Sequence, residues 1–238
     1  MKFSSFLFEK MSIDTLVLDE FYKIITPNKV EMFDRIAAQR TKYLTIALEN
    51  IYQEHNASAV LRSCDCFGLQ EMHVIEKGFQ YSVQRDIALG AGRWVDLFNY
   101  NLGDNPTEDC FLHLKNKGYQ IVATSPHTDS YTIHDIPIDQ PLAFFFGTER
   151  RGLSEEIINR ADYHLKIPMY GFTESFNISV SVALVLQVLR DRLEKSELKW
   201  KLSEEEQISL KIKWSRKILN GGQALENEFR KRLNQKEL

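Results

Sequence analysis

Several features that mark particular classes of protein are scarce in this sequence. It has 3 cysteines in 238 residues, and Cys64-x-Cys66 without a second pair is poor spacing for a metal site. Its 6 histidines include no two that are four residues apart, so no helix face offers the common pair of zinc ligands. The longest apolar runs, such as 142–146, are far shorter than the roughly 20 residues that span a membrane. We therefore expect inert thiols, no catalytic metal and no membrane association.

The first residues lack a secretion signal, and the charge of the chain is unevenly spread. The segment from Met1 has a short apolar patch that Glu9 breaks, without a cleavage site of small residues, so we expect a cytoplasmic protein. The net charge is -3, yet residues 190–238 hold 13 Lys and Arg against 9 Asp and Glu. A basic tail on an acidic body suits an RNA contact, although a solvated helix face is the commoner meaning of such a segment.

Between about residues 45 and 190, short apolar runs alternate with stretches of helical periodicity. This alternation predicts an α/β domain with a mainly parallel sheet covered by helices. Hydrophobic residues make up 43% of the chain and charged residues 26%, which is the balance of an ordinary folded protein. The predicted strands are 44–48, 72–76, 94–100, 119–124, 142–146 and 163–167.

Capping residues predict where the helices of this core begin. Asn105 is placed to cap a helix that Pro106 opens, and Asn56 is placed to cap a helix that runs to residue 67. Residues 177–183 alternate like a strand, but the apolar pattern continues with helical spacing. We therefore favour a helix capped by Asn177.

Both ends of the chain, outside this core, are predicted to be helical. Residues 30–43 form an amphipathic pattern with basic and polar side chains on one face. Ser203 and Glu206 form a capping box that opens a second helix, which ends near residue 220. We expect three segments: an N-terminal extension and helix (1–43), an α/β domain (44–195) and a C-terminal helical extension (196–238).

Glycines gather late in the core rather than after its first strand. No glycine lies between residues 49 and 56, which excludes a dinucleotide-type glycine cradle at that position. Gly147 and Gly152 instead follow the strand at 142–146, and Gly171 follows the last strand. These loops can bring backbone close to a ligand, although turn geometry alone also explains such glycines.

Three segments, taken in order and spacing, resemble the motifs of the SpoU RNA ribose methyltransferases. They are Asn56 to Arg62, Phe146 to Ser154, and Ile167 to Met169 followed by Ser175 to Ser181. The likeness extends over roughly residues 30–220. It implies an α/β fold of the SPOUT type with a C-terminal deep trefoil knot, and a homodimer with active sites at the subunit interface. It also implies methylation of a ribose 2'-hydroxyl with S-adenosyl-L-methionine. A knot departs from the general rule of unthreaded chains, so only the resemblance supports it.

The resemblance assigns catalytic roles to five residues, each of which also has a structural explanation. Arg62 is implied to activate the ribose hydroxyl, but a guanidinium is a reluctant base, so we prefer a role in holding an RNA phosphate and stabilising the alkoxide. Its structural alternative is an ion pair with Asp65. Asn56, Ser175 and Asn177 are alternatively helix caps. Glu149 is alternatively a solvated acid or a partner of Arg150.

The same resemblance implies the cofactor contacts. Backbone amides and apolar walls should hold the adenosine moiety, with contributions from Thr124, Gly147, Ile167, Met169 and Phe176. Position 176 departs from the family, which usually has leucine there. No metal is required, because methyl transfer from a sulfonium needs alignment and deprotonation rather than a Lewis acid.

The substrate implied by the resemblance is tRNA, in particular guanosine 18 of the D-loop. The end helices resemble those of the family members that methylate this nucleotide, and we expect RNA contacts from Arg35, Arg40 and Lys42. The rival within the family is a ribosomal RNA 2'-O-methyltransferase, which usually carries a separate N-terminal RNA-binding domain that residues 1–44 are too short to form. A non-catalytic RNA-binding factor is a third possibility, against which the five catalytic-type residues speak.

Overall fold

The structure is a computed structural model that describes residues 12–51, 53–77, 88–125, 130–148 and 151–235. The chain divides into two compact units. One unit is continuous, Thr41–Lys201, and the other joins the two ends of the chain, Met1–Arg40 and Leu202–Leu238. Within the described residues, no helix combines the length and apolarity that crossing a bilayer requires.

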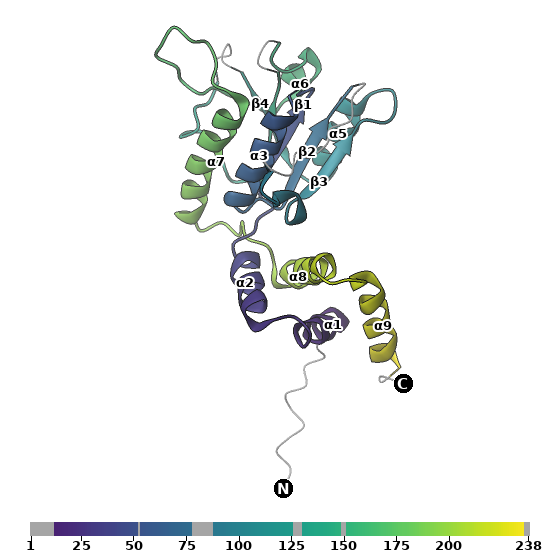
Figure 1. The fold of residues 1–238 in the computed structure, drawn as a ribbon. Helices are drawn as coiled ribbons and strands as arrows, with labels where there is room; N and C mark the ends of the chain where they lie inside the picture. Colours follow the sequence, from purple (N-terminus) through teal and green to yellow (C-terminus); the bar gives the residue numbers. More distant parts are fainter. Residues whose placement is uncertain (1–11, 52, 78–87, 126–129, 149–150, 236–238) are drawn as a thin grey trace. The chain divides into compact units, whose positions relative to one another are not determined.

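The continuous unit contains a six-stranded parallel sheet (Figure 1). Its strands lie in the order β3-β2-β1-β5-β4-β6. All six predicted strands are present, with boundaries that differ by one or two residues, which confirms the predicted fold class. The strands are β1 (Leu44–Glu49), β2 (Glu71–Ile75), β3 (Asp96–Tyr100), β4 (Gln120–Thr124), β5 (Leu142–Phe146) and β6 (Tyr163–Leu165).

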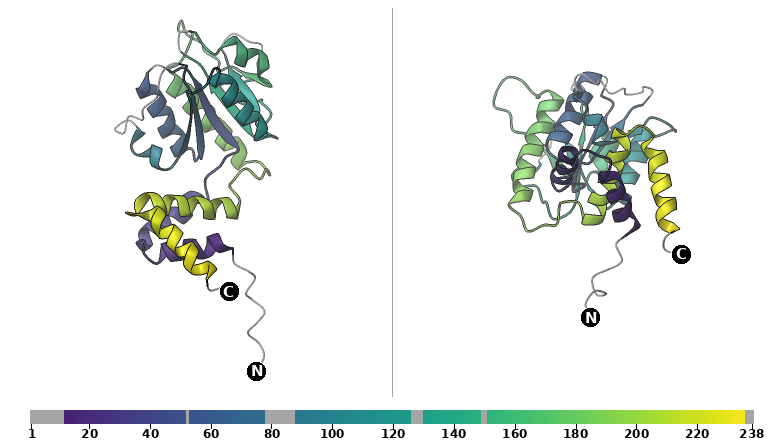
Figure 2. Two further views of the ribbon diagram at one scale, coloured as in Figure 1. Left: turned by 90° about the vertical axis from the view of Figure 1, so that its right-hand side faces the viewer. Right: turned by 60° about the horizontal axis from the view of Figure 1, so that its bottom comes forward.

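Helices cover both faces of this sheet, as Figure 2 (left) shows for α3 and α5. One face packs against α3 (Glu54–Cys66) and α7 (Ile178–Glu194), and the other against α5 (Pro106–Asn116) and α6 (Glu155–Arg160). A short 3-10 helix, η1, spans Ala91–Arg93. The central strands β1 and β5 are buried along their whole length, because helices on both faces of a parallel sheet shield its middle strands from solvent.

Most of the predicted helix starts are confirmed. The side chain of Asn105 accepts a hydrogen bond from the Glu108 amide at the start of α5, and that of Asn177 accepts one from the Ser179 amide at the start of α7. The predicted cap at Asn56 is wrong. Gln53 occupies the N-cap position of α3, which places Asn56 inside the first turn, where its side chain is buried.

The second unit consists of α1 (Ile13–Tyr22), α2 (Pro27–Ala37), α8 (Glu204–Ile218) and α9 (Gly222–Asn234). Aromatic contacts hold it together: Phe21 lies 5.2 Å from Phe229, and Phe33 lies 5.3 Å from Trp214, between ring centroids. The capping box at Ser203 is present. The predicted helix over 30–43 is displaced, since α2 begins at Pro27 and ends at Ala37. Helices α1 and α9 had no counterpart in our prediction.

Candidate functional site

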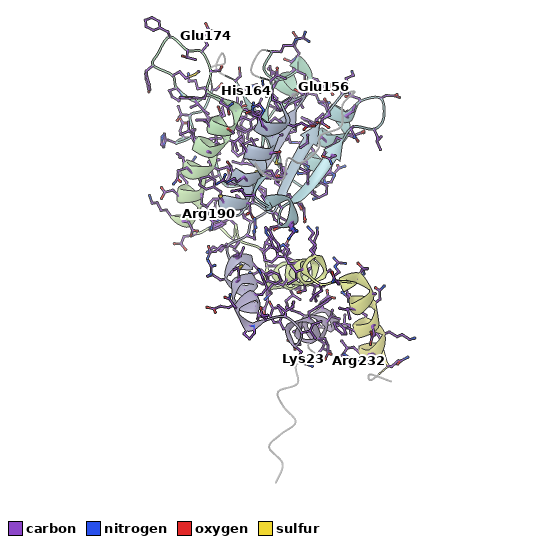
Figure 3. The ribbon with its side chains drawn as sticks, viewed as in Figure 1. Lys23, Glu156, His164, Glu174, Arg190 and Arg232 are labelled. Atoms are coloured by element: carbon purple, nitrogen blue, oxygen red, sulfur yellow. The ribbon has the colours of Figure 1, made fainter. Side chains whose placement is uncertain are left out.

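The loops that follow β4, β5 and β6 meet at the carboxyl edge of the sheet and surround a cavity. Parallel strands carry their ligand sites at this edge. The main part of the cavity has a volume of about 350 Å³, which is within the usual range for ligand pockets. A smaller part of about 90 Å³ adjoins it. Figure 3 shows Glu174, one of its lining residues, on the loop that leads into α7, with Arg190 toward the other end of that helix.

The structure brings all five predicted cofactor residues together around this cavity. Thr124, Gly147 and Phe176 line the main part, and Ile167 and Met169 line the smaller part. They come from three loops that are up to 52 residues apart in sequence. Phe176 is 41% exposed, so it stands at the rim of the cavity.

A tight hairpin after β5 forms one wall of the cavity. The backbones of Thr148 and Gly152 exchange two hydrogen bonds of 2.9 and 3.1 Å, and Gly152 has a φ of 66°. A Cβ atom at Gly147 would lie 2.1 Å from the carbonyl carbon of Gly152 and 2.3 Å from the amide nitrogen of Leu153. The backbone of Gly152 and Leu153 therefore packs so closely against Gly147 that no side chain fits there.

Two of the predicted catalytic residues touch each other across the first and third motifs. The side-chain nitrogen of Asn177 donates a 3.0 Å hydrogen bond to the side-chain oxygen of Asn56. Asn56 in turn donates a 2.9 Å hydrogen bond to the Gln53 side chain. This contact joins the start of α3 to the start of α7, beside Ser175, which lines the cavity. Asn177 is both a helix cap and a member of this cluster.

The structure describes only one of the other two predicted catalytic residues, Arg62. Arg62 is exposed on α3, and it is not among the described residues that line either part of the cavity. Glu149, with Arg150, lies outside the described residues.

The three predicted RNA-contact residues have very different surroundings. Arg35 is exposed in the last turn of α2. Arg40 is only 2% exposed, and its guanidinium lies 5.6 Å from the centre of the Trp214 ring. Lys42 lies half-buried just before β1. Because α2 ends at Ala37, these side chains do not share a helix face, and the burial of Arg40 argues against a phosphate contact there.

Some residues around the cavity were missed from the sequence. Glu174 and Ser125 line it, and the buried carboxylate of Glu49 holds the base of the hairpin through Ser154. Glu49 directly follows the predicted strand 44–48, and an acidic residue at the carboxyl end of a buried strand is a signal that could have singled it out. Within the described residues, no group of three or more His, Cys, Asp and Glu side chains could hold a metal ion.

Comparison with known proteins matches this architecture to a family. Residues 43–187 match the family described as SpoU rRNA methylase. The chain is 41% identical over 205 residues to a tRNA (guanosine(18)-2'-O)-methyltransferase of Borreliella burgdorferi, which covers 86% of this chain and 92% of the relative.

The chain belongs to the SpoU rRNA methylase family.

Two further relatives agree with this assignment. A tRNA (guanosine(18)-2'-O)-methyltransferase of Aquifex aeolicus is 31% identical over 81% of this chain and 90% of its own length. The crystal structure of a TrmH/SpoU tRNA-modifying enzyme from A. aeolicus superposes with a TM-score of 0.71 at 30% identity, covering 81% of this chain and 98% of that one. For this SpoU family member, all three motifs fall inside the matched range, and the loops that carry the second and third motifs border the cavity.

Proposed function

We propose that the protein transfers a methyl group from S-adenosyl-L-methionine to the 2'-hydroxyl of guanosine 18 in tRNA. The observation that carries this proposal is the 41% identity to a relative of that name over 86% of the chain. The cavity at the carboxyl edge of the sheet supplies a place for the cofactor. A tRNA substrate also suits a cytoplasmic protein.

The lining of the cavity fits this cofactor. Apolar side chains such as Phe146, Leu153 and Ile178 offer walls for an adenine ring, and Gly147 and Gly152 border the same cavity. Thr124 stands at the end of β4, where its hydroxyl donates a 2.7 Å hydrogen bond to the Phe145 carbonyl. Bound here, S-adenosyl-L-methionine supplies a methyl group on a positively charged sulfur.

The residues around the cavity have separate tasks in this mechanism. The Asn56–Asn177 contact holds the third-motif loop against α3 and so fixes Ser175 at the rim. A guanidinium stabilises the ribose oxygen as it loses its proton, and it holds the neighbouring phosphate, which accepts or polarises that proton. Arg62 has the chemistry for this task, but it does not reach the cavity of its own chain.

We therefore propose that the active protein is a homodimer in which Arg62 of the partner subunit completes each site. An apolar stripe supports a second copy as the occupant of this face. Phe176, Val180 and Leu184 are 41%, 45% and 39% exposed. Val180 and Leu184 lie four residues apart on one side of α7, and Phe176 directly precedes the N-cap of that helix, Asn177. The stripe begins at the cavity rim, so a subunit that covers it comes close to the reacting groups.

Two variants test the dimer. Leu184→Glu should convert a species near twice 27.8 kDa into a monomer during sedimentation at micromolar concentration, because it places a charge in the interface. The matched control is Leu112→Glu on α5, where the leucine is 45% exposed on the opposite face of the sheet. A dimeric Leu184→Glu protein, or a monomeric wild type with full activity, would refute the interface.

Mixing two inactive variants tests whether Arg62 acts across subunits. Arg62→Ala and a Gly147→Val variant should each be inactive alone. After mixing and subunit exchange, activity should return to about one quarter of the wild-type value, because half of the molecules are mixed dimers and each has one intact site. No recovery, with mixed dimers demonstrated by mass spectrometry, would place Arg62 in its own chain's site.

The substrate is tested with unmodified tRNA and labelled cofactor, followed by nuclease mapping of the methylated ribose. Label should appear at guanosine 18 and disappear when guanosine 18 carries a 2'-deoxyribose. Label confined to ribosomal RNA would favour the other substrate class of the family and defeat this proposal.

We further propose that the end helices contact the tRNA, with Arg35 as the exposed phosphate ligand. Replacing Arg35 by glutamine should reduce the salt dependence of tRNA binding by about one unit of slope.

A further inference from the structure

A buried carboxylate that belongs to none of the three motifs anchors the hairpin beside the cavity. Glu49 is 3% exposed at the end of β1. One of its oxygens accepts a 2.8 Å hydrogen bond from the amide of Ser154. The other accepts hydrogen bonds from the hydroxyls of Ser154, at 2.7 Å, and Thr107, at 3.2 Å.

The position of Glu49 follows from the sheet register. Leu48 pairs with Phe146 in the parallel ladder, so Glu49 lies beside Gly147, where the hairpin begins. Ser154 lies just after the hairpin, which ends at Gly152. The carboxylate thus ties the end of the hairpin to the strand next to its start. Asn50, which follows, has a φ of 54° and turns the chain away from this point.

The charge of Glu49 is accommodated by two helix starts. Thr107 lies in the first turn of α5, and Ser154 caps α6 through the Ile157 amide. Helix N-termini favour a negative charge within their first turn. Within the described residues, Glu49 forms no ion pair. Hydrogen bonds and helix dipoles therefore offset the cost of burying its charge. Burial raises the pKa of the neighbouring Cys110 thiol, and the charge of Glu49 raises it further.

We propose that Glu49 is a positioning residue for cofactor binding: it holds the paired backbones of Thr148 and Gly152, which form one wall of the cavity, in place. The inference rests on the proposed function, because it takes S-adenosylmethionine as the ligand of that cavity. Leu153, between the hairpin and Ser154, lines the cavity and transmits the effect. Release of Ser154 lets this wall move, whereas the rest of the sheet keeps its contacts.

Glu71 provides a matched control. It is also a buried carboxylate in the same sheet, 5% exposed, but it begins β2 at the amino edge and pairs with Lys117 at 3.0 Å. Removing Glu49 leaves the Ser154 amide without its partner, and removing Glu71 breaks the pair with the half-exposed Lys117, so both changes should lower stability. Only the removal of Glu49 should affect the cavity.

The experiment compares Glu49→Ala, Glu49→Gln, Ser154→Ala and Glu71→Ala in the full-length protein. Hydrogen exchange of the ligand-free protein should accelerate at least tenfold in residues 151–157 of Glu49→Ala and remain unchanged there in Glu71→Ala. Titration calorimetry with S-adenosylhomocysteine should show Kd raised at least tenfold in Glu49→Ala. Glu49→Gln should show about threefold, because its amide oxygen can still accept the Ser154 N–H. Glu71→Ala should remain within twofold of wild type.

Each outcome has one reading. Unchanged exchange and Kd in Glu49→Ala would overturn the inference, and so would an equal rise of Kd in Glu71→Ala, since both would mean that Glu49 contributes only general stability. If Glu49→Ala does not fold, Glu49→Gln and Ser154→Ala carry the test, and either must raise Kd about threefold. A wild-type protein that binds no S-adenosylhomocysteine would refute the proposed function, while the exchange measurement would still decide whether Glu49 anchors the hairpin.

Discussion

Adding a single methyl group at Gly147 should damage the cofactor site more than its size suggests. Ordinary carbon contacts begin near 3.4 Å, whereas the new Cβ of Gly147→Ala would lie 2.1 Å from the Gly152 carbonyl carbon. The backbone at residues 152 and 153 must therefore move by about 1.3 Å. Overpacking of this kind costs about 1–3 kcal/mol, and the displaced segment includes the Leu153 wall of the cavity.

We expect Gly147→Ala to lose about 1–3 kcal/mol of unfolding free energy in urea. Its Kd for S-adenosylmethionine should rise about tenfold or more, which corresponds to about 1.4 kcal/mol of lost binding energy. The control is Gly171→Ala, in the loop after Met169, where a Cβ meets nothing within 4 Å. That variant should stay within about 0.5 kcal/mol of wild type and keep its Kd. Unaltered cofactor affinity in Gly147→Ala would refute the role given to the hairpin.

Three further predictions concern catalysis, capping and pH. Arg62→Ala should lower single-turnover methyl transfer at least 100-fold with an unchanged cofactor Kd, because its guanidinium acts on the transition state; near-normal turnover would contradict its role. Asn177→Ala should cost about 1–2 kcal/mol in urea unfolding and reduce methylation, whereas Asn105→Ala should cost a similar amount without reducing methylation; equal activities would reduce Asn177 to a cap. Burial lowers the pKa of His73 to about 3, with help from His113 and Lys117, so the unfolded chain takes up a proton first as the pH falls. Wild-type protein should therefore lose about 2 kcal/mol from this group between pH 7 and pH 5. His73→Phe should lose correspondingly less in urea unfolding at the two pH values, and an equal loss in both proteins would contradict the assignment.

The sheet and most of its helix starts followed from local patterns. Each strand is a short apolar run between helical stretches. Asn105 and Ser203 mark the starts of their helices, because their side chains accept hydrogen bonds from the first turn. Asn56 shows the limit of such reasoning. An asparagine ahead of a helix resembles a cap, but in the structure Asn56 lies inside the helix, and its side-chain oxygen accepts a hydrogen bond from Asn177.

The end helices were harder to predict because their limits depend on contacts between distant segments. Helix α2 ends at Ala37, and Arg40, which we predicted to contact RNA, packs on the Trp214 ring of α8 instead. The trefoil knot implied by the family resemblance stays a prediction, since apolar periodicity carries no information on how a chain threads.

The sequence by itself determined the strands, the core helices and the order of the three motifs, because these depend on apolar periodicity, capping and residues that are close in the chain. The tertiary structure alone decided which of those residues share a cavity, why Gly147 tolerates no side chain, and that Glu49 holds the hairpin. The tertiary structure also showed that Arg62 does not reach the cavity of its own chain. These are relations between segments tens of residues apart, fixed by sheet register and packing, and no local pattern records them.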